Sequence, residues 1–374
     1  MTNPMHSRGS FARVLLGASL LGVASLAACN QDKLLTAPTP DVVQPQDIAS
    51  KAALPSAFAA AVGDFQLAYA GGYGGQLPLL DYNEGLAQMT ALLSDEMLDA
   101  ETYNTRIEVD RRATTNINST TLQTFQDAQR ARATADLVSG RYRDLDPTNP
   151  NRAEAQALAA FMYVLFAEDY CNGVPTSRVL ADGTFQYGAP QSGTQLLNTA
   201  IAKFDSAITV ATAAGSEGSE ALNLAMLGKG RALLDLGQYA QAADDFDATL
   251  AGRTSFRARL GPLLWRYAAQ VRARRDARAL LAKDVGNENL SEWPAPIAKF
   301  LLGKMSAGEL EVAAETDEAA SRTNGKCAAS FFIGIDAIRR GDKQRAREQL
   351  QLTQARCPTV SELNWAAASE LKRL

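Results

Sequence analysis

The sequence has one histidine, His6, and four cysteines in 374 residues. His6 lies in a segment that we expect to be removed as a signal peptide, so the processed chain would contain no histidine. This excludes histidine-based catalytic triads and most zinc sites. A Cys171 nucleophile would lack its usual base, and a structural role suits it better. We therefore predict a protein that is not an enzyme and that needs no cofactor or metal.

Two other absences limit the function classes. No apolar run after the first thirty residues is long enough to span a membrane. Basic residues number 37 and acidic residues 41, so the chain lacks the basic excess of a nucleic-acid-binding protein. Carboxylates are plentiful, and composition alone leaves a two-carboxylate glycosidase open. Asp95 and Glu96 are poor candidates for it, because adjacent residues point away from each other on a helix.

The first residues are typical of a bacterial lipoprotein. Arg8 and Arg13 precede an apolar run over residues 14–26, and small residues follow directly before Cys29. This pattern predicts a signal peptide over residues 1–28, with Cys29 as the lipidated first residue of the processed chain. Residues 29–55 are rich in proline, glutamine, aspartate and threonine, which favours a flexible tether.

Residues 221–250 have the pattern of one complete helical hairpin. Apolar residues recur at spacings of three and four, Gly230 allows a close helix approach, and Gly237 suits the turn. Gly334 and Gly341 repeat this spacing in a second copy; the alternative is two unrelated helix pairs. One hairpin cannot bury its apolar face alone, so neighbours are implied. We predict an all-α fold, a right-handed α-α superhelix of tetratricopeptide-like helical hairpins.

The rest of the chain also has helical periodicity and no strand pattern of comparable strength. We expect residues 152–170 to be central, because they are apolar nearly all round. Ser192 is a plausible cap for a helix over residues 194–213. The least regular part is residues 104–118. Further helices are expected over residues 52–70, 82–100 and 121–137.

Several of these segments together resemble a known family. A lipoprotein signal, a long helix running into residues 168–175 (EDYCNGVP), a loop with residues 187–190 (YGAP) and residues 228–234 (GKGRALL) are similar to SusD/RagB nutrient-uptake lipoproteins. Cys171 and Asn172 depart from the commonest form of that turn. The resemblance covers about residues 10–250. It implies an outer-membrane protein, facing the exterior, that binds glycans or other nutrients and caps a SusC-like TonB-dependent transporter.

The C-terminal part resembles a second family. Residues 293–297 (WPAPI), 300–303 (FLLG), 331–334 (FFIG) and 357–358 (CP) are similar to NlpI-like tetratricopeptide lipoproteins, which are scaffolds for envelope enzymes. The alternative function is therefore a tetratricopeptide scaffold that binds envelope proteins. The expected organisation is a SusD-like helical region over residues 56–213 followed by tetratricopeptide-like repeats over residues 214–374.

Few residues stand out as site candidates. In an oxidising envelope, Cys327 at the first position of one helix and Cys357 just after its partner helix are expected to form a disulfide, with Cys171 left over.

Exposed aromatic rings could stack on sugars, although core packing is the alternative for each. The ligand-binding candidates are Tyr69, Tyr73 and Tyr82, with Trp265 and Trp293. Residues 253–278 are rich in arginine. They form either a solvated helical face that pairs with the acidic run 244–247 or a docking surface for an acidic partner or anionic polymer.

Overall fold

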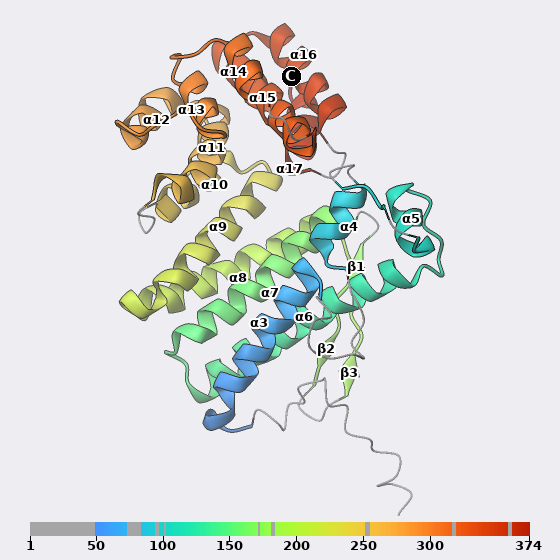
Figure 1. Ribbon diagram of the computed structural model, residues 1–374. Coiled ribbons are helices and arrows are strands. Elements are labelled where there is room, and N and C mark those ends of the chain that lie inside the picture. The colour runs from blue at the N-terminus through green and yellow to red at the C-terminus, as the bar shows by residue number, and fades with distance from the viewer. Residues whose placement is uncertain are drawn as a thin grey trace, which may run out of the picture. The chain divides into compact units, whose positions relative to one another are not determined.

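The computed structural model of the protein describes residues 49–72, 84–93, 97–100, 102–170, 173–180, 184–250, 255–315, 319–357 and 361–374. All of them belong to one compact unit, Gln44–Leu374. This unit is mostly helical (Figure 1), which confirms the expected all-α class. The predicted signal peptide, Cys29 and most of the tether lie outside the described residues.

Fifteen α-helices and two short 3-10 helices lie in the described ranges. In chain order they are η1 (Lys51–Ala53), α3 (Leu54–Ala70), α4 (Leu86–Leu93), α5 (Asn104–Asp110), α6 (Ser119–Leu145), α7 (Pro150–Asp169), α8 (Gly193–Ala213), η2 (Gly215–Gly218), α9 (Ser219–Asp235), α10 (Tyr239–Leu250), α11 (Phe256–Arg272), α12 (Ala277–Val285), α13 (Ala295–Leu301), α14 (Ala307–Ala313), α15 (Ala319–Arg340), α16 (Lys343–Arg356) and α17 (Glu362–Leu371).

The connection between α7 and α8 contains the strands of the described chain. β1 (Val174–Pro175) pairs antiparallel with β4 (Pro190–Gln191), and β2 (Arg178–Val179) pairs antiparallel with β3 (Phe185–Gln186). The sequence did not predict them. Strands of two residues are too short for an alternating pattern to show.

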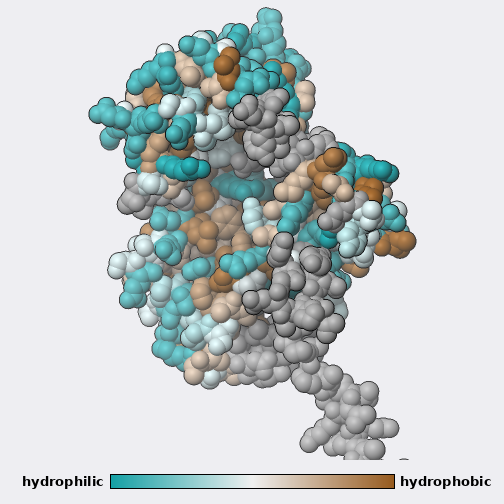
Figure 2. Space-filling model, in the orientation of Figure 1, coloured by the Kyte–Doolittle hydropathy of each residue, from teal (hydrophilic) through white to brown (hydrophobic). Residues whose placement is uncertain are grey.

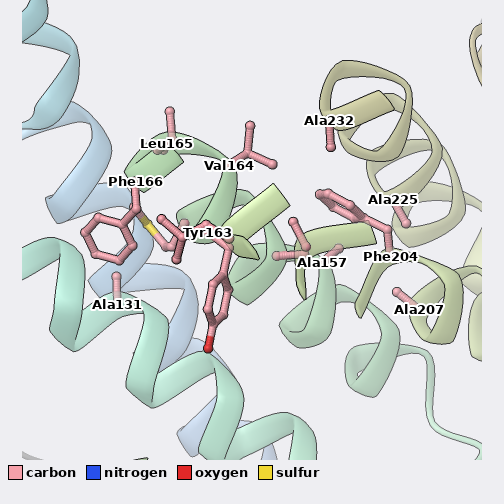
Figure 3. Close-up of a cluster of buried hydrophobic side chains, with 14 of the residues drawn as sticks. Ala131, Ala157, Tyr163, Val164, Leu165, Phe166, Phe204, Ala207, Ala225 and Ala232 are labelled. Atoms are coloured by element: carbon pink, nitrogen blue, oxygen red, sulfur yellow. The ribbon is translucent and has the colours of Figure 1, made fainter. Parts of the chain in front are cut away.

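The first hydrophobic core is built around α7, as expected from its apolar surface. α7 packs against α3, α6, α8 and α9 (Figure 1). Phe166 and Phe204 are fully buried in this core. In Figure 3, Phe166 reaches toward Ala131 of α6, and Phe204 of α8 lies between Ala157 and Ala225. Ser192 caps α8 with a capping box that includes Gln195, which confirms the predicted cap.

A second core contains residues of α11 to α17, and a smaller cluster around Phe246 joins α9, α10 and α11. Two hairpins, α9–α10 and α15–α16, are built alike. A Cβ on Gly230 would lie 2.9 Å from Phe246 Cε1, and one on Gly334 would lie 3.0 Å from Leu350 Cγ. Gly237 and Gly341 have φ of 74° and 78° at the two turns. The close-approach and turn glycines therefore have the predicted roles in both copies.

Three expectations about helices are wrong in part. The helix expected over residues 82–100 is α4, and Met97 to Ala100 are not helical; Leu98 is 80% exposed and does not join a core. In the segment expected to be irregular, α5 forms because Val109 packs on Met89 and Leu92. The last residues of the expected tether, 51–55, are helical; they form η1 and the start of α3.

Cys327 and Cys357 form a disulfide, with Cα atoms 4.8 Å apart. The sequence analysis expected Cys327 at the first position of a helix. It lies instead inside α15, which begins at Ala319. The two cysteines still meet because α15 and α16 pack against each other and Cys357 directly follows α16.

Peptide mapping of the unreduced, full-length protein should therefore recover one peptide pair, joined through Cys327 and Cys357. Both sulfurs are joined in the disulfide, so alkylation without a reductant should leave them unmodified. A mapped bond from either cysteine to Cys171 would contradict the pairing.

Candidate functional site

A cavity of about 800 Å³ lies in the described part of the chain. Its walls come from both ends of the unit: α3, α4, α7, α8, α9, α10, α11, α15 and α17 each contribute residues. The cavity thus lies where the first core, the second core and the cluster around Phe246 meet. Figure 2 shows apolar side chains reaching the surface beside a hollow at the middle of the visible face. A volume of this size suits a small organic ligand.

Aromatic rings form much of the wall. They are contributed by six residues: Tyr69, Phe161, Tyr239, Phe246, Trp265 and Phe331. Tyr69, at the end of α3, is 46% exposed and stacks on Phe65 with an interplanar angle of 10°. Trp265 packs against Phe331 with ring centroids 5.8 Å apart. Flat apolar rings at a partly open wall can stack on the apolar face of a ligand.

Charged groups enter the same cavity at the end of α7. Arg231 of α9 donates two hydrogen bonds to Glu168, from Nε and Nη2, each 2.6 Å long. This bidentate pair fixes α9 against the last turn of α7. Asp169 follows directly, and its Oδ2 is buried and accepts no hydrogen bond from a described residue. Burial, with the Glu168 charge, raises the pKa of Asp169 to about 7, and Arg231 offsets part of this rise.

Two more acids line the wall, Asp235 at the end of α9 and Glu370 in α17. Glu370 forms an ion pair with Arg272. The guanidinium of Arg373 lies over the ring of Tyr239, 5.3 Å from its centroid. The cavity therefore combines apolar rings with a few convergent polar groups, the composition of a small-molecule site.

The residues proposed from the sequence are only partly brought together. Tyr69 and Trp265 line the cavity. Trp293 is partly buried against the second core, as the packing alternative expected. Tyr73, Tyr82 and Cys171, like Asp95 and Glu96, lie outside the described residues.

Two arginines of the segment 253–278 pair with the acidic run of the preceding helix, as one of the two interpretations expected, although one of the two is buried and not on a solvated face. Arg275 donates two hydrogen bonds to Asp244, one of them 3.2 Å long. Arg266 is 3% exposed and pairs with both Asp247 and Asp284. Because these arginines form ion pairs within the protein, the segment presents less positive charge to an acidic partner than its number of arginines implies.

Sequence reasoning missed the charged half of the cavity. Glu168 and Asp169 were used only as part of a turn motif, and Arg231 only as part of a family motif. Acids in the last turn of a helix oppose the helix dipole, but helices away from the cavity carry them too, as α5 does with Asp110 and α14 with Glu311, so this pattern alone does not single out the site. Asp169 and Asp235 are the last residues of α7 and α9.

The comparisons with known proteins identify no relative. The sequence matches no family profile, and no curated protein or solved structure is significantly similar to it. A search of the described helices found none that combines the length and the apolar character needed to cross a bilayer.

Proposed function

We propose that the protein is an outer-membrane lipoprotein of the SusD/RagB type that binds oligosaccharides and delivers them to a TonB-dependent transporter. The observation that carries this proposal is the cavity, where Tyr69 and Trp265 offer ring faces and Glu168, Asp169 and Arg231 offer hydrogen-bonding groups. Protein sites for small polar ligands combine these two kinds of group. The sequence resemblance over residues 10–250 supports the same assignment.

We further propose that the helical hairpins stack as a right-handed α-α superhelix. The like construction of α9–α10 and α15–α16 supports this, since repeats of one supersecondary unit bury their apolar faces by stacking. In this arrangement the protein binds its ligand without transforming it.

Binding should be measured on the full-length protein in detergent, by calorimetry with neutral oligosaccharides of two to six units. Trp265→Ala should weaken any binding at least tenfold, because a stacked ring is lost. Trp293→Ala is the matched control, since Trp293 does not line the cavity. Failure of every saccharide to bind, or equal effects of the two variants, would count against the cavity as the site.

Delivery requires a partner, which is tested separately. Pull-down from solubilised membranes should recover a TonB-dependent transporter, bound through the region 56–213 that carries the closest resemblance. The second candidate function is a scaffold for envelope proteins, and the tetratricopeptide-like turns at Gly237 and Gly341 favour it. Recovery of peptidoglycan enzymes or proteases without a transporter would support the scaffold instead.

The membrane anchor gives another prediction. Cys29→Ser should move the protein from the membrane fraction to the soluble fraction, because residues after the lipobox contain no other long apolar run. Fractionation and immunoblotting measure this, with Cys327→Ser as a control that leaves the lipobox intact. Retention of the Cys29→Ser protein in membranes would contradict the lipoprotein assignment.

A further inference from the structure

A second cavity, with a volume of about 570 Å³, lies where α6, α7 and α8 meet the strands between α7 and α8. It shares no lining residue with the first cavity. Basic side chains outnumber acidic ones in its wall. The charged lining residues are Arg132, Arg141, Arg143, Arg178 and Lys203, with Asp136 and Asp144. A concave surface with charge of mainly one sign attracts a ligand of the opposite sign.

One carboxylate in this wall, that of Asp136 in α6, is shared by two cations. Its Oδ2 accepts hydrogen bonds from Arg132 Nη1 at 3.2 Å and from the Tyr163 hydroxyl at 3.3 Å, and its Oδ1 accepts one from Lys203 Nζ. Arg132 is 3% exposed, and neither cation pairs with a second carboxylate of the described chain. This group therefore keeps one positive charge that no acid offsets.

The ring of Tyr163 fixes both of these cations in place. The Arg132 guanidinium lies 5.8 Å from the ring centroid, and Lys203 Nζ lies 5.4 Å from it. In Figure 3, the hydroxyl of Tyr163 points away from the buried hydrophobic side chains around it. The first core thus anchors the ring, and the ring holds the cations. Groups that are held before a ligand arrives lose little freedom when it binds.

Arg178 adds a second positive charge from the opposite wall. It belongs to β2, which lies beside α6 (Figure 1). Arg178 Nε donates to Gln186 Oε1 at 2.6 Å, and Gln186 is its partner in the β2–β3 ladder. This contact with a neutral side chain uses one of five guanidinium N–H groups. Within the described residues Arg178 forms no ion pair, and the hydroxyl of the neighbouring Ser177 forms no hydrogen bond.

The other two arginines are not needed for this count. Arg143 pairs with Asp144 at 2.9 Å, so these two charges cancel. Arg141 has interactions of its own within the protein, and we assign it no role. The wall then holds two positive charges without a matching acid, one from the group around Asp136 and one from Arg178.

We propose that this second cavity binds a small molecule through a phosphate or sulfate monoester group, held by Arg178, Lys203 and the Ser177 hydroxyl. These donors come from β2, from α8 and from the residue before β2, so they reach the cavity from three places. Three points of contact match the three terminal oxygens of a monoester better than the two of a planar carboxylate. The volume leaves room for an organic body beyond a bare ion.

The proposal does not rest on saccharide binding in the first cavity, and calorimetry on the full-length protein in an uncharged detergent tests it. Glucose 6-phosphate and glucose 6-sulfate should bind at least tenfold more tightly than glucose, and added salt should weaken them. Arg178→Gln should weaken both esters about tenfold, because one charge-assisted contact is lost. Arg347→Gln, which changes an exposed arginine of α16 outside the cavity, is the matched control and should bind them unchanged.

A lipid ester shows where such a group comes from. Dihexanoyl phosphatidic acid, used below its micelle concentration, should bind more weakly than glucose 6-phosphate if the ligand is a soluble ester, and more tightly if it is a lipid headgroup. Either order supports the monoester site.

Three results would overturn the proposal. Glucose 6-phosphate that binds no better than glucose would show that the cavity does not recognise the anionic group. Ester binding that survives in Arg178→Gln, or that is lost in Trp265→Ala, would place the anion outside this second cavity. Circular dichroism of each variant verifies that it is folded.

Discussion

Replacing Gly228 with alanine is expected to lower the free energy of unfolding by about 2 to 3 kcal/mol, as overpacking of a tight core does. A Cβ at this position of α9 would overlap the Cζ atom of Phe204 and lie 2.8 Å from Phe161 Cζ. These two rings pack edge to face, with centroids 5.2 Å apart. Phe204 is fully buried, so its ring cannot turn away into solvent.

Gly140 provides the matched control for this substitution. It lies inside α6, and a Cβ there would meet no atom within 4 Å. Gly140→Ala should therefore raise stability by up to about 1 kcal/mol, the difference in helix propensity. Urea unfolding followed by circular dichroism measures both variants. If Gly228→Ala were as stable as the unchanged protein, α9 would not pack on Phe204 as described.

The fold was largely predictable because its signals are local. Each hairpin needs a glycine with positive φ at its turn, and Gly237 and Gly341 have this conformation. Each also needs a small residue where the helices cross, and Gly230 and Gly334 supply it. The cap at Ser192 and the apolar surface of α7 are likewise determined by residues that are close together in the sequence. Such patterns follow from helix geometry, whatever the tertiary contacts are.

The candidate site was much less predictable because it depends on distant residues. Asp169, Asp235 and Glu370 come from three helices, and only the tertiary packing brings them to one cavity. The aromatic candidates show the same limit. Tyr69 and Trp265 reach the cavity, but Trp293 packs on the second core, and local sequence does not distinguish them. Acids in last helical turns do not distinguish the site either, because α5 and α14 also carry one there.

If Asp169 holds a ligand, the free protein should be less stable for it. A buried carboxylate without a hydrogen-bond partner at Oδ2 destabilises the folded state until a ligand supplies that partner. Function and stability then favour different residues at this position, as is common at binding sites. Replacing Asp169 with asparagine should for this reason increase the stability of the free protein.

Asp169→Asn is accordingly expected to stabilise the free protein at pH 8 and to have little effect at pH 4. The pKa of Asp169 is about 7 in the folded state, against an ordinary value of 3.8. Burial and the charge of Glu168 raise it, and Arg231 lowers it in part. Because the folded state holds the proton more tightly, the contribution of this group to stability is complete below pH 4. It is lost progressively as the pH rises to about 7.

The size of the effect follows from that shift. A rise of the Asp169 pKa from 3.8 to about 7 corresponds to a loss of stability of at most about 4 kcal/mol at high pH. We expect a difference of about 2 kcal/mol between the two proteins, because buried sites respond as if they were more polar than a dry interior. Urea unfolding between pH 4 and pH 8 should show the two proteins diverging across this window, with the variant more stable at the upper end. Asp144→Asn, which changes an exposed carboxylate, should follow the unchanged protein throughout. Parallel curves for Asp169→Asn and the unchanged protein would mean that Asp169 is ionised at little cost in the folded state, and the explanation of its raised pKa by burial would then be wrong.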